Sequence, residues 1–338
     1  MNNQILKVDA DIICAASVVG KKERNGPIGN MFDVYDETDR FKQKTWEKAE
    51  SEMQKRAFSQ ALTKAGLSPD GVDALFAGDL LNQCIGSAYG LLDYDIPYFG
   101  LYGACSTIIE GLILSSLLIT SGYFERCAAV TSSHFCSAEQ QYRNPLEYGG
   151  QRSPTAQWTV TGSGAFIIGR SSDNVSKVKI TQALPGIVID KGINDAANMG
   201  AAMAPAAIDT LCRFFEGTNT KPDDYDAIFT GDLGYEGSTI LKEFMVAEGY
   251  PMHNYEDCGN IIYDRASQDV HSGGSGCGCS AVVLASYIIP KLISGEYKNV
   301  LVIGTGAMMS PSSLKQGQSI PAIAHLIKLE RKENDYGA

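Results

Sequence analysis

The sequence predicts an α/β protein built from two related halves. Residues 69–81 recur 153 positions later as residues 222–234, with eight of the thirteen positions identical. A fainter repeat, offset by 173, pairs residues 121–122 and 127–130 with residues 294–295 and 300–303. Both offsets lie near half of the 338 residues, which is typical of a duplicated structural unit. We therefore expect an N-terminal half, 1–172, and a C-terminal half, 173–338, with a site where they meet.

The first half alternates helical and strand patterns. Residues 45–65 place their apolar side chains on one stripe, which predicts a helix, and Gly66 follows as its C-cap. The remaining patterns predict a strand at 73–77, a helix at 108–121, a strand at 127–131 and two β-prone runs within 158–169, interrupted by the glycines at 162–164. We expect these glycines to mark a bulge or a close backbone approach rather than a phosphate-binding loop.

The second half repeats this order, with a helix at 201–215, a strand at 227–230, a helix at 280–292 and a strand at 299–303. Alternating strands and long helices indicate a mainly parallel sheet in each half. The helices at 108–121 and 280–292 are apolar nearly all round, so they belong between two sheets. With further helices outside, we expect a five-layer αβαβα sandwich.

Composition excludes several classes of function. A net charge of −11 and a pI near 4.9 argue against nucleic acid and against direct adsorption to anionic lipid. Nine cysteines without a disulfide spacing indicate reduced thiols, and we expect a cytoplasmic protein. The N-terminus lacks a signal-peptide pattern, and the apolar run at 108–119 is too short to span a bilayer. Any membrane association would come through a partner.

Two motifs resemble the thiolase superfamily. The segment Gly-Ala-Cys-Ser-Thr at 103–107 places Cys105 immediately before the buried helix, where thiolases and β-ketoacyl synthases keep their nucleophilic cysteine. His271 opens the segment His-Ser-Gly-Gly-Ser-Gly, which is similar to the thiolase element Gly-His-Pro-x-Gly-x-Ser-Gly, one residue short. The resemblance implies a thiolase-like, duplicated αβαβα sandwich. It also implies a homodimer formed by pairing edge strands of the first halves.

A closer resemblance is to the stage V sporulation protein AD family of endospore formers. It extends from about residue 26 to residue 325 and is carried by the segments at 78–83, 131–134, 148–151, 199–207 and 273–280. The resemblance implies a non-catalytic protein that binds dipicolinic acid and helps its uptake into the developing spore. It further implies a peripheral location at the forespore inner membrane, through membrane proteins of the same operon.

Cys105 suits two kinds of chemistry. A thiol at a helix N-terminus faces unpaired N–H groups and the positive end of the helix dipole, which favour a thiolate. Such a position suits a nucleophile for acyl transfer or an anion-binding pocket equally well. The alternative function is therefore an acyl-thioester condensing enzyme that uses Cys105 and His271. A third hypothesis is a scaffold subunit whose pocket is vestigial.

The partners for condensation are incomplete. Ketoacyl synthase III places a histidine directly after a strand, and aligning residues 226–230 with that strand puts Gly231 at this position and Asp232 one residue further. The second thiolase cysteine is expected near 303–306, where no thiol occurs. Only His271 remains as a carry-over, so we favour a binding protein over an enzyme.

The predicted ligand site also includes residues that follow strands. Ser133 and His134 come after the strand at 127–131, at the edge where parallel sheets present ligands. Because a protonated imidazole would bind a dianion best, we expect affinity to rise as the pH falls toward 6. Asp79 and Asp232 either cap turns or hold dipicolinate through a shared calcium ion. No zinc site is expected from Cys277 and Cys279. The predicted ligand-binding residues are Cys105, His134, Ser133, Asp79, Asp232 and His271.

Overall fold

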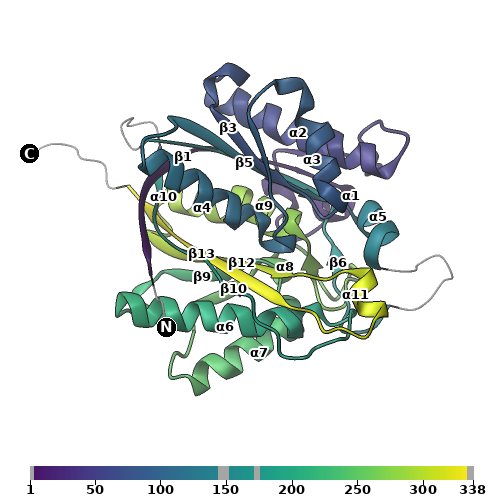
Figure 1. The fold of residues 1–338 in the computed structure, drawn as a ribbon, viewed down its shortest axis with the longest axis vertical. Coiled ribbons are helices and arrows are strands. Elements are labelled where there is room, and N and C mark those ends of the chain that lie inside the picture. The colour runs from purple at the N-terminus through teal and green to yellow at the C-terminus, as the bar shows by residue number, and fades with distance from the viewer. Residues whose placement is uncertain (1–3, 144–151, 171–175, 333–338) are drawn as a thin grey trace, which may run out of the picture.

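The chain folds into five alternating layers of helices and strands. The computed structural model describes residues 4–143, 152–170 and 176–332. Two layers of strands enclose a central helical layer, and further helices cover the outside (Figure 1), which confirms the predicted fold class. The outer helices are α2 (Trp46–Ala65) and α3 (Ile85–Leu91) on one side and α6 (Met199–Thr218) and α7 (Gly234–Ala247) on the other; the central ones are α4 (Thr107–Thr120), α9 (Cys277–Val283) and α10 (Ile289–Ser294).

The main strands of the two halves are hydrogen-bonded into one continuous sheet, where the sequence predicted two separate ones; β6 (Trp158–Thr159) and β11 (Gly274–Ser275) form a separate short pair. The outer three strands at each end of this sheet are parallel, and the strands between them are antiparallel. The order is β10 (Tyr255–Asp257), β9 (Ala227–Thr230), β12 (Asn299–Ala307), β13 (Ala322–Arg331), β8 (Val178–Leu184), β1 (Leu6–Val19), β7 (Gly162–Arg170), β5 (Arg126–Ser133), β3 (Ala74–Gly78) and β4 (Tyr98–Gly100).

β1 joins the two halves. Its residues 10–19 pair with β7, whereas its residues 6–11 pair with β8, so the strand leaves one half-sheet and enters the other. The pairing register shifts within both ladders, which is the irregularity expected where a strand bends. The two half-sheets can therefore face each other across α4, which contacts strands of both.

The bounds of α2 follow from capping residues that the sequence shows. Thr45 caps α2 by accepting from the Lys48 N–H at 3.4 Å, and Gly66 ends it in the left-handed region at φ +66°. In the centre, α9 and α10 form one helical run, Cys277–Ser294, with a π-helical segment between them. Among the described residues, this is the one helical run that is long and apolar enough to cross a bilayer by length and composition alone. However, 72% of it is buried inside the protein, as expected for a core helix.

The duplication is visible in the fold. Each long repeat copy forms a short 3₁₀ turn followed by a strand, β3 in the first half and β9 in the second. Asp79 directly follows β3, and Asp232 follows β9 after one intervening residue, so the two aspartates occupy equivalent positions of the repeat. The glycines at 162–164 open β7, and a Cβ at Gly164 would lie 2.8 Å from the Ala281 carbonyl carbon of α9. The predicted close backbone approach is thus confirmed.

Candidate functional site

Cys105 lies at the start of α4, beside a small cavity. The 3₁₀ turn Ala104–Ser106 leads directly into this helix, and Ala104 takes a left-handed φ of +51°. Cys105 is buried and packs with Leu80 and Cys277 in a small apolar cluster. The cavity has a volume of about 190 Å³. Its lining residues are Leu80, Tyr102, Ala104, Cys105, Met199, Ala307, Met308, Met309 and Ser310.

Three helices begin at this cavity. α4 starts just after Cys105, α6 starts at Met199, and α11 (Pro311–Lys315) starts after Ser310. Unpaired N–H groups and the positive end of the helix dipole favour an anion at such termini. None of the nine lining residues is charged, so no lining side chain opposes this bias. The cavity lining itself is therefore apolar and uncharged.

Two polar residues of the second half lie beside Cys105. Ser275 Oγ is 4.0 Å from Cys105 Sγ and donates to the Asp232 carboxylate at 2.9 Å. The same carboxylate accepts from the Gly276 N–H at 2.9 Å and from Thr305 Oγ1 at 2.7 Å, and it also hydrogen-bonds to the Cys105 thiol. The candidate site therefore combines Cys105 of the first half with Asp232 and Ser275 of the second.

Asp232 corrects the expected position of the catalytic partner. The sequence placed Gly231 there, but the structure brings the side chain one residue further along to Cys105. Burial raises the pKa of Asp232 above its usual value, although its hydrogen bonds oppose the shift. An ionised carboxyl group only accepts hydrogen bonds, so in that form Asp232 could not donate to an oxyanion as a neutral imidazole does. Ser275 was missed, although it lies within the segment that follows His271.

Ser133 does not line the Cys105 cavity. It ends β5, and its hydroxyl donates to the Val160 carbonyl at 2.7 Å while accepting from the Gly278 N–H at 3.1 Å. Both partners belong to the packing of β5 against neighbouring strands and the start of α9. Its expected contact with a ligand is therefore not supported by the geometry.

His134 does not line the cavity either. Its Nδ1 accepts from the Cys136 N–H at 3.1 Å, and its Nε2 lies 2.8 Å from the Asp39 carbonyl oxygen. Burial lowers the pKa of His134. Burial and the engagement of both ring nitrogens do not favour the expected contact between a protonated His134 and the ligand, which stays a prediction.

Asp79 is a buried turn carboxylate. It accepts from the Leu81 N–H at 2.9 Å and from the backbone and hydroxyl of Ser87, both at 2.6 Å. Burial raises its pKa. This arrangement matches the alternative in which the repeated aspartates satisfy backbone N–H groups. Asp79 and Asp232 both lie outside the cavity lining, so the geometry does not support a calcium ion shared between them and a ligand there.

His271 lies outside the cavity lining as well. Its Nδ1 is 2.7 Å from the Ser153 carbonyl oxygen, and its Nε2 is 3.1 Å from Asp269. The structure therefore does not assemble the pair of Cys105 and His271 that the condensing alternative requires. Over residues 4–143, 152–170 and 176–332, no group of three or more His, Cys, Asp or Glu side chains is placed to hold a metal ion.

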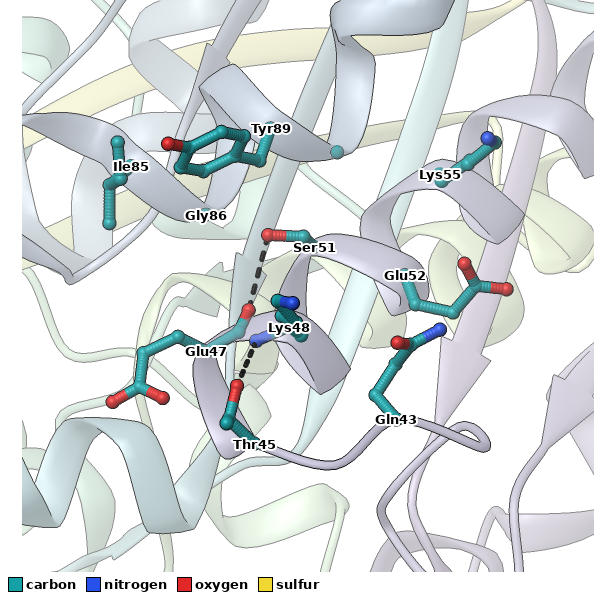
Figure 2. Close-up of a pocket in the computed structure, with 11 residues that line it drawn as sticks. Gln43, Thr45, Glu47, Lys48, Ser51, Glu52, Lys55, Ile85, Gly86 and Tyr89 are labelled. Atoms are coloured by element: carbon teal, nitrogen blue, oxygen red, sulfur yellow. Dashed lines mark hydrogen bonds between the residues drawn. The ribbon is translucent and has the colours of Figure 1, made fainter.

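A second, larger cavity of about 500 Å³ lies between α2 and α3. Figure 2 shows Tyr89 of α3 above Ser51 of α2, with charged side chains around them. None of the six predicted site residues lines it. Lys48 and Lys55 are matched by Glu47 and Glu52, so this cavity has no excess of positive charge for an anion.

Comparison with known proteins identifies the family. The sequence matches the family described as stage V sporulation protein AD over residues 2–330. It is 46% identical to stage V sporulation protein AD of Bacillus subtilis (strain 168) over 319 residues, which cover 94% of this chain and 93% of the relative. The chain belongs to the stage V sporulation protein AD family. The resemblance stated from the sequence is confirmed.

Solved structures of other proteins share the fold of this chain. It is similar to 3-oxoacyl-[acyl-carrier-protein] synthase III from Aquifex aeolicus, with a TM-score of 0.57 at 15% identity, covering 95% of this chain and 99% of the other. It is also similar to an OleA variant of Xanthomonas campestris with bound lauric acid and lauroyl-CoA, with a TM-score of 0.62 at 13% identity, covering 96% and 100%. At these identities the likeness shows the fold alone.

Proposed function

We propose that this sporulation protein binds dipicolinate in the Cys105 cavity without transforming it, and that it thereby helps the uptake of dipicolinate into the developing spore. The observation that carries this proposal is an uncharged apolar cavity at which three helices begin. Dipicolinate is a small, flat aromatic dianion. Its ring needs apolar walls and its carboxylates need a positive electrostatic bias, and this cavity offers both.

The cavity walls fit the two ends of such a ligand. Leu80, Met199 and Met308 supply apolar surface for the ring, and methionine adapts well to aromatic groups. Ser310 adds a hydroxyl group at the start of α11. The cavity volume of about 190 Å³ limits the size of the ligand that it can hold. This room suits one small ring better than a long acyl chain.

The proposal includes a homodimer and membrane partners. β4 is the edge of the sheet, and its side chains Tyr98 and Phe99 are 39% and 48% exposed. Nearby on the same end of the sheet, Tyr89 and Leu92 are also exposed. An unpaired edge with exposed apolar side chains favours pairing with a second copy. Membrane proteins of the same operon would hold the dimer at the forespore inner membrane.

A condensing or acyl-transfer enzyme is the second candidate. It is favoured by the fold of the similar structures, one of which holds lauroyl-CoA, and by a cysteine at the start of a buried helix. Against it, a carboxyl group and a hydroxyl lie beside Cys105 in place of an imidazole. Incubation with acetyl-coenzyme A should leave the mass of Cys105 peptides unchanged. A stoichiometric acetyl adduct on Cys105 would establish the enzyme instead.

Calorimetric titration with dipicolinate, with and without calcium, tests the proposal. We expect saturable binding that Cys105→Leu weakens by about 1–3 kcal/mol, because the larger side chain fills part of the cavity and removes the thiol donor. Cys212→Leu, at a half-buried thiol of α6 outside the cavity, is the matched control and should bind as the wild type does. Absence of wild-type binding under both conditions would refute the function, and normal binding by Cys105→Leu would refute the site.

A further inference from the structure

The hydrogen bonds beside Cys105 have a direction that depends on one proton. As a carboxylate, Asp232 can only accept, so the Ser275 hydroxyl and the Cys105 thiol both donate to it. Asp232 does not line the cavity, so both hydrogens are directed away from that space. A ligand carboxylate beside Cys105 would then meet the sulfur atom and a fixed negative charge close behind it.

Protonation of Asp232 reverses this direction. Its new O–H group donates to Ser275 Oγ, which lies 2.9 Å away. The Ser275 hydroxyl hydrogen is released from Asp232 and can turn toward Cys105 Sγ, 4.0 Å away. The thiol hydrogen is released in the same way and can turn into the cavity. Thr305 and the Gly276 N–H continue to hold the carboxyl group in place, so no backbone movement is required.

We propose that an anionic ligand enters the Cys105 cavity together with one proton, which Asp232 takes up from solvent, and that Asp232, Ser275 and Cys105 then form a chain of donors ending at the ligand. The inference rests on the proposed function and deepens it, because it assigns Asp232 the control of when the site accepts a carboxylate ligand. No covalent bond changes, apart from the proton gained by the Asp232 carboxylate.

The surroundings of Asp232 support this coupling. Its hydrogen-bond partners Ser275, Thr305 and Gly276 are neutral, and the neighbouring carboxyl of Asp257 adds negative charge when ionised. Burial already raises the pKa of Asp232 without a ligand, and a bound anion beside Cys105 would raise it further. The titratable groups that face it are Cys105, Asp257, Cys258 and Cys279.

Titration calorimetry with dipicolinate in buffers of different ionisation enthalpy measures the protons bound. At pH values where free Asp232 is ionised, we expect the wild type to take up close to one proton on binding, and its apparent affinity to fall up to tenfold per pH unit. Asp232→Asn should bind without proton uptake and with an affinity independent of pH. Asp257→Asn, which removes the neighbouring carboxyl group outside the donor chain, is the matched control and should still take up the proton on Asp232, although at a lower pH because one nearby negative charge is gone.

Ser275→Ala tests the donor chain separately from the proton uptake on Asp232. This variant should bind dipicolinate about tenfold more weakly while still taking up the proton on Asp232. The inference is overturned if the wild type binds dipicolinate without proton uptake, or if Asp232→Asn still takes up a proton. It is also overturned if proton uptake is lost in Asp257→Asn but not in Asp232→Asn. If the Asp232 variant does not fold, the wild-type and Asp257→Asn proton counts decide. Failure of the wild type to bind dipicolinate at any pH overturns the proposed function instead.

Discussion

Glu50 of α2 gives the sharpest test of how burial acts in this fold. Its side chain is fully buried, and its oxygens accept from Ser132 Oγ at 2.9 Å and from Ser137 Oγ at 2.6 Å. Burial, with a smaller contribution from the neighbouring Asp79, raises the pKa of Glu50 from 4.5 to about 8. Two hydroxyl donors therefore do not compensate the loss of water, and the folded protein holds a neutral Glu50 at pH 7.

This raised pKa predicts the pH dependence of stability. Below pH 4.5 Glu50 is protonated in both the folded and the unfolded state, so its ionisation does not change the free energy of unfolding. Between 4.5 and about 8 the unfolded carboxylate ionises while the folded one keeps its proton, so stability falls as the pH rises. The free energy of unfolding falls by about 1.36 kcal/mol per pH unit over this range. The total loss is about 5 kcal/mol, and it does not increase further above pH 8.

Replacing Glu50 by Gln should remove this loss. Relative to the wild type, we expect Glu50→Gln to gain about 3–5 kcal/mol in free energy of unfolding between pH 4.5 and pH 8.5. Urea denaturation of both proteins at the two pH values measures the difference. Glu47→Gln, at the less buried residue of the same helix, controls for the loss of a carboxylate from α2. An equal effect of Glu50→Gln at both pH values would refute the proposed cost of burying this group.

Two further predictions concern packing and assembly. Gly164→Ala should lower the free energy of unfolding by about 1–3 kcal/mol, because its Cβ would lie 2.7 Å from the Ala281 Cβ, whereas Gly71→Ala meets only Leu67 at 3.5 Å; equal melting temperatures would contradict this. Light scattering should give about twice 36.3 kDa, and Tyr98→Glu on the β4 edge should give a monomer while Tyr123→Glu, 80% exposed elsewhere, stays dimeric; a monomeric wild type would reject the dimer.

The sequence predicted those elements whose signals are local. β9 matches its predicted bounds, and α2 matches within one residue because Thr45 and Gly66 cap it. β1, β8, β13 and α7 were not predicted. The structure of β1 depends on pairing with two strands more than 140 residues away, and no local period encodes that choice of partners. For the same reason, the sequence did not show that the half-sheets form one continuous sheet.

The site was predicted in part. Cys105 was found because its position before an apolar helix is a local pattern. Asp232 was named as a candidate, but the alignment that put Gly231 at the partner position missed it by one residue. The expected ligand contacts of Ser133 and His134 stay predictions that the geometry does not favour, since both side chains are hydrogen-bonded to nearby backbone. Ser275 reaches Cys105 only when the two halves meet, which a single segment does not reveal.

A crystal structure of the protein with dipicolinate tests the central claim most directly. The proposal predicts density for one planar ligand beside Cys105, between Met199 and Met308, with a carboxylate near the start of α4. A ligand in the cavity between α2 and α3, or beside His134 and Ser133, would contradict the assigned site. An empty Cys105 cavity at a dipicolinate concentration that saturates binding in solution would contradict it equally.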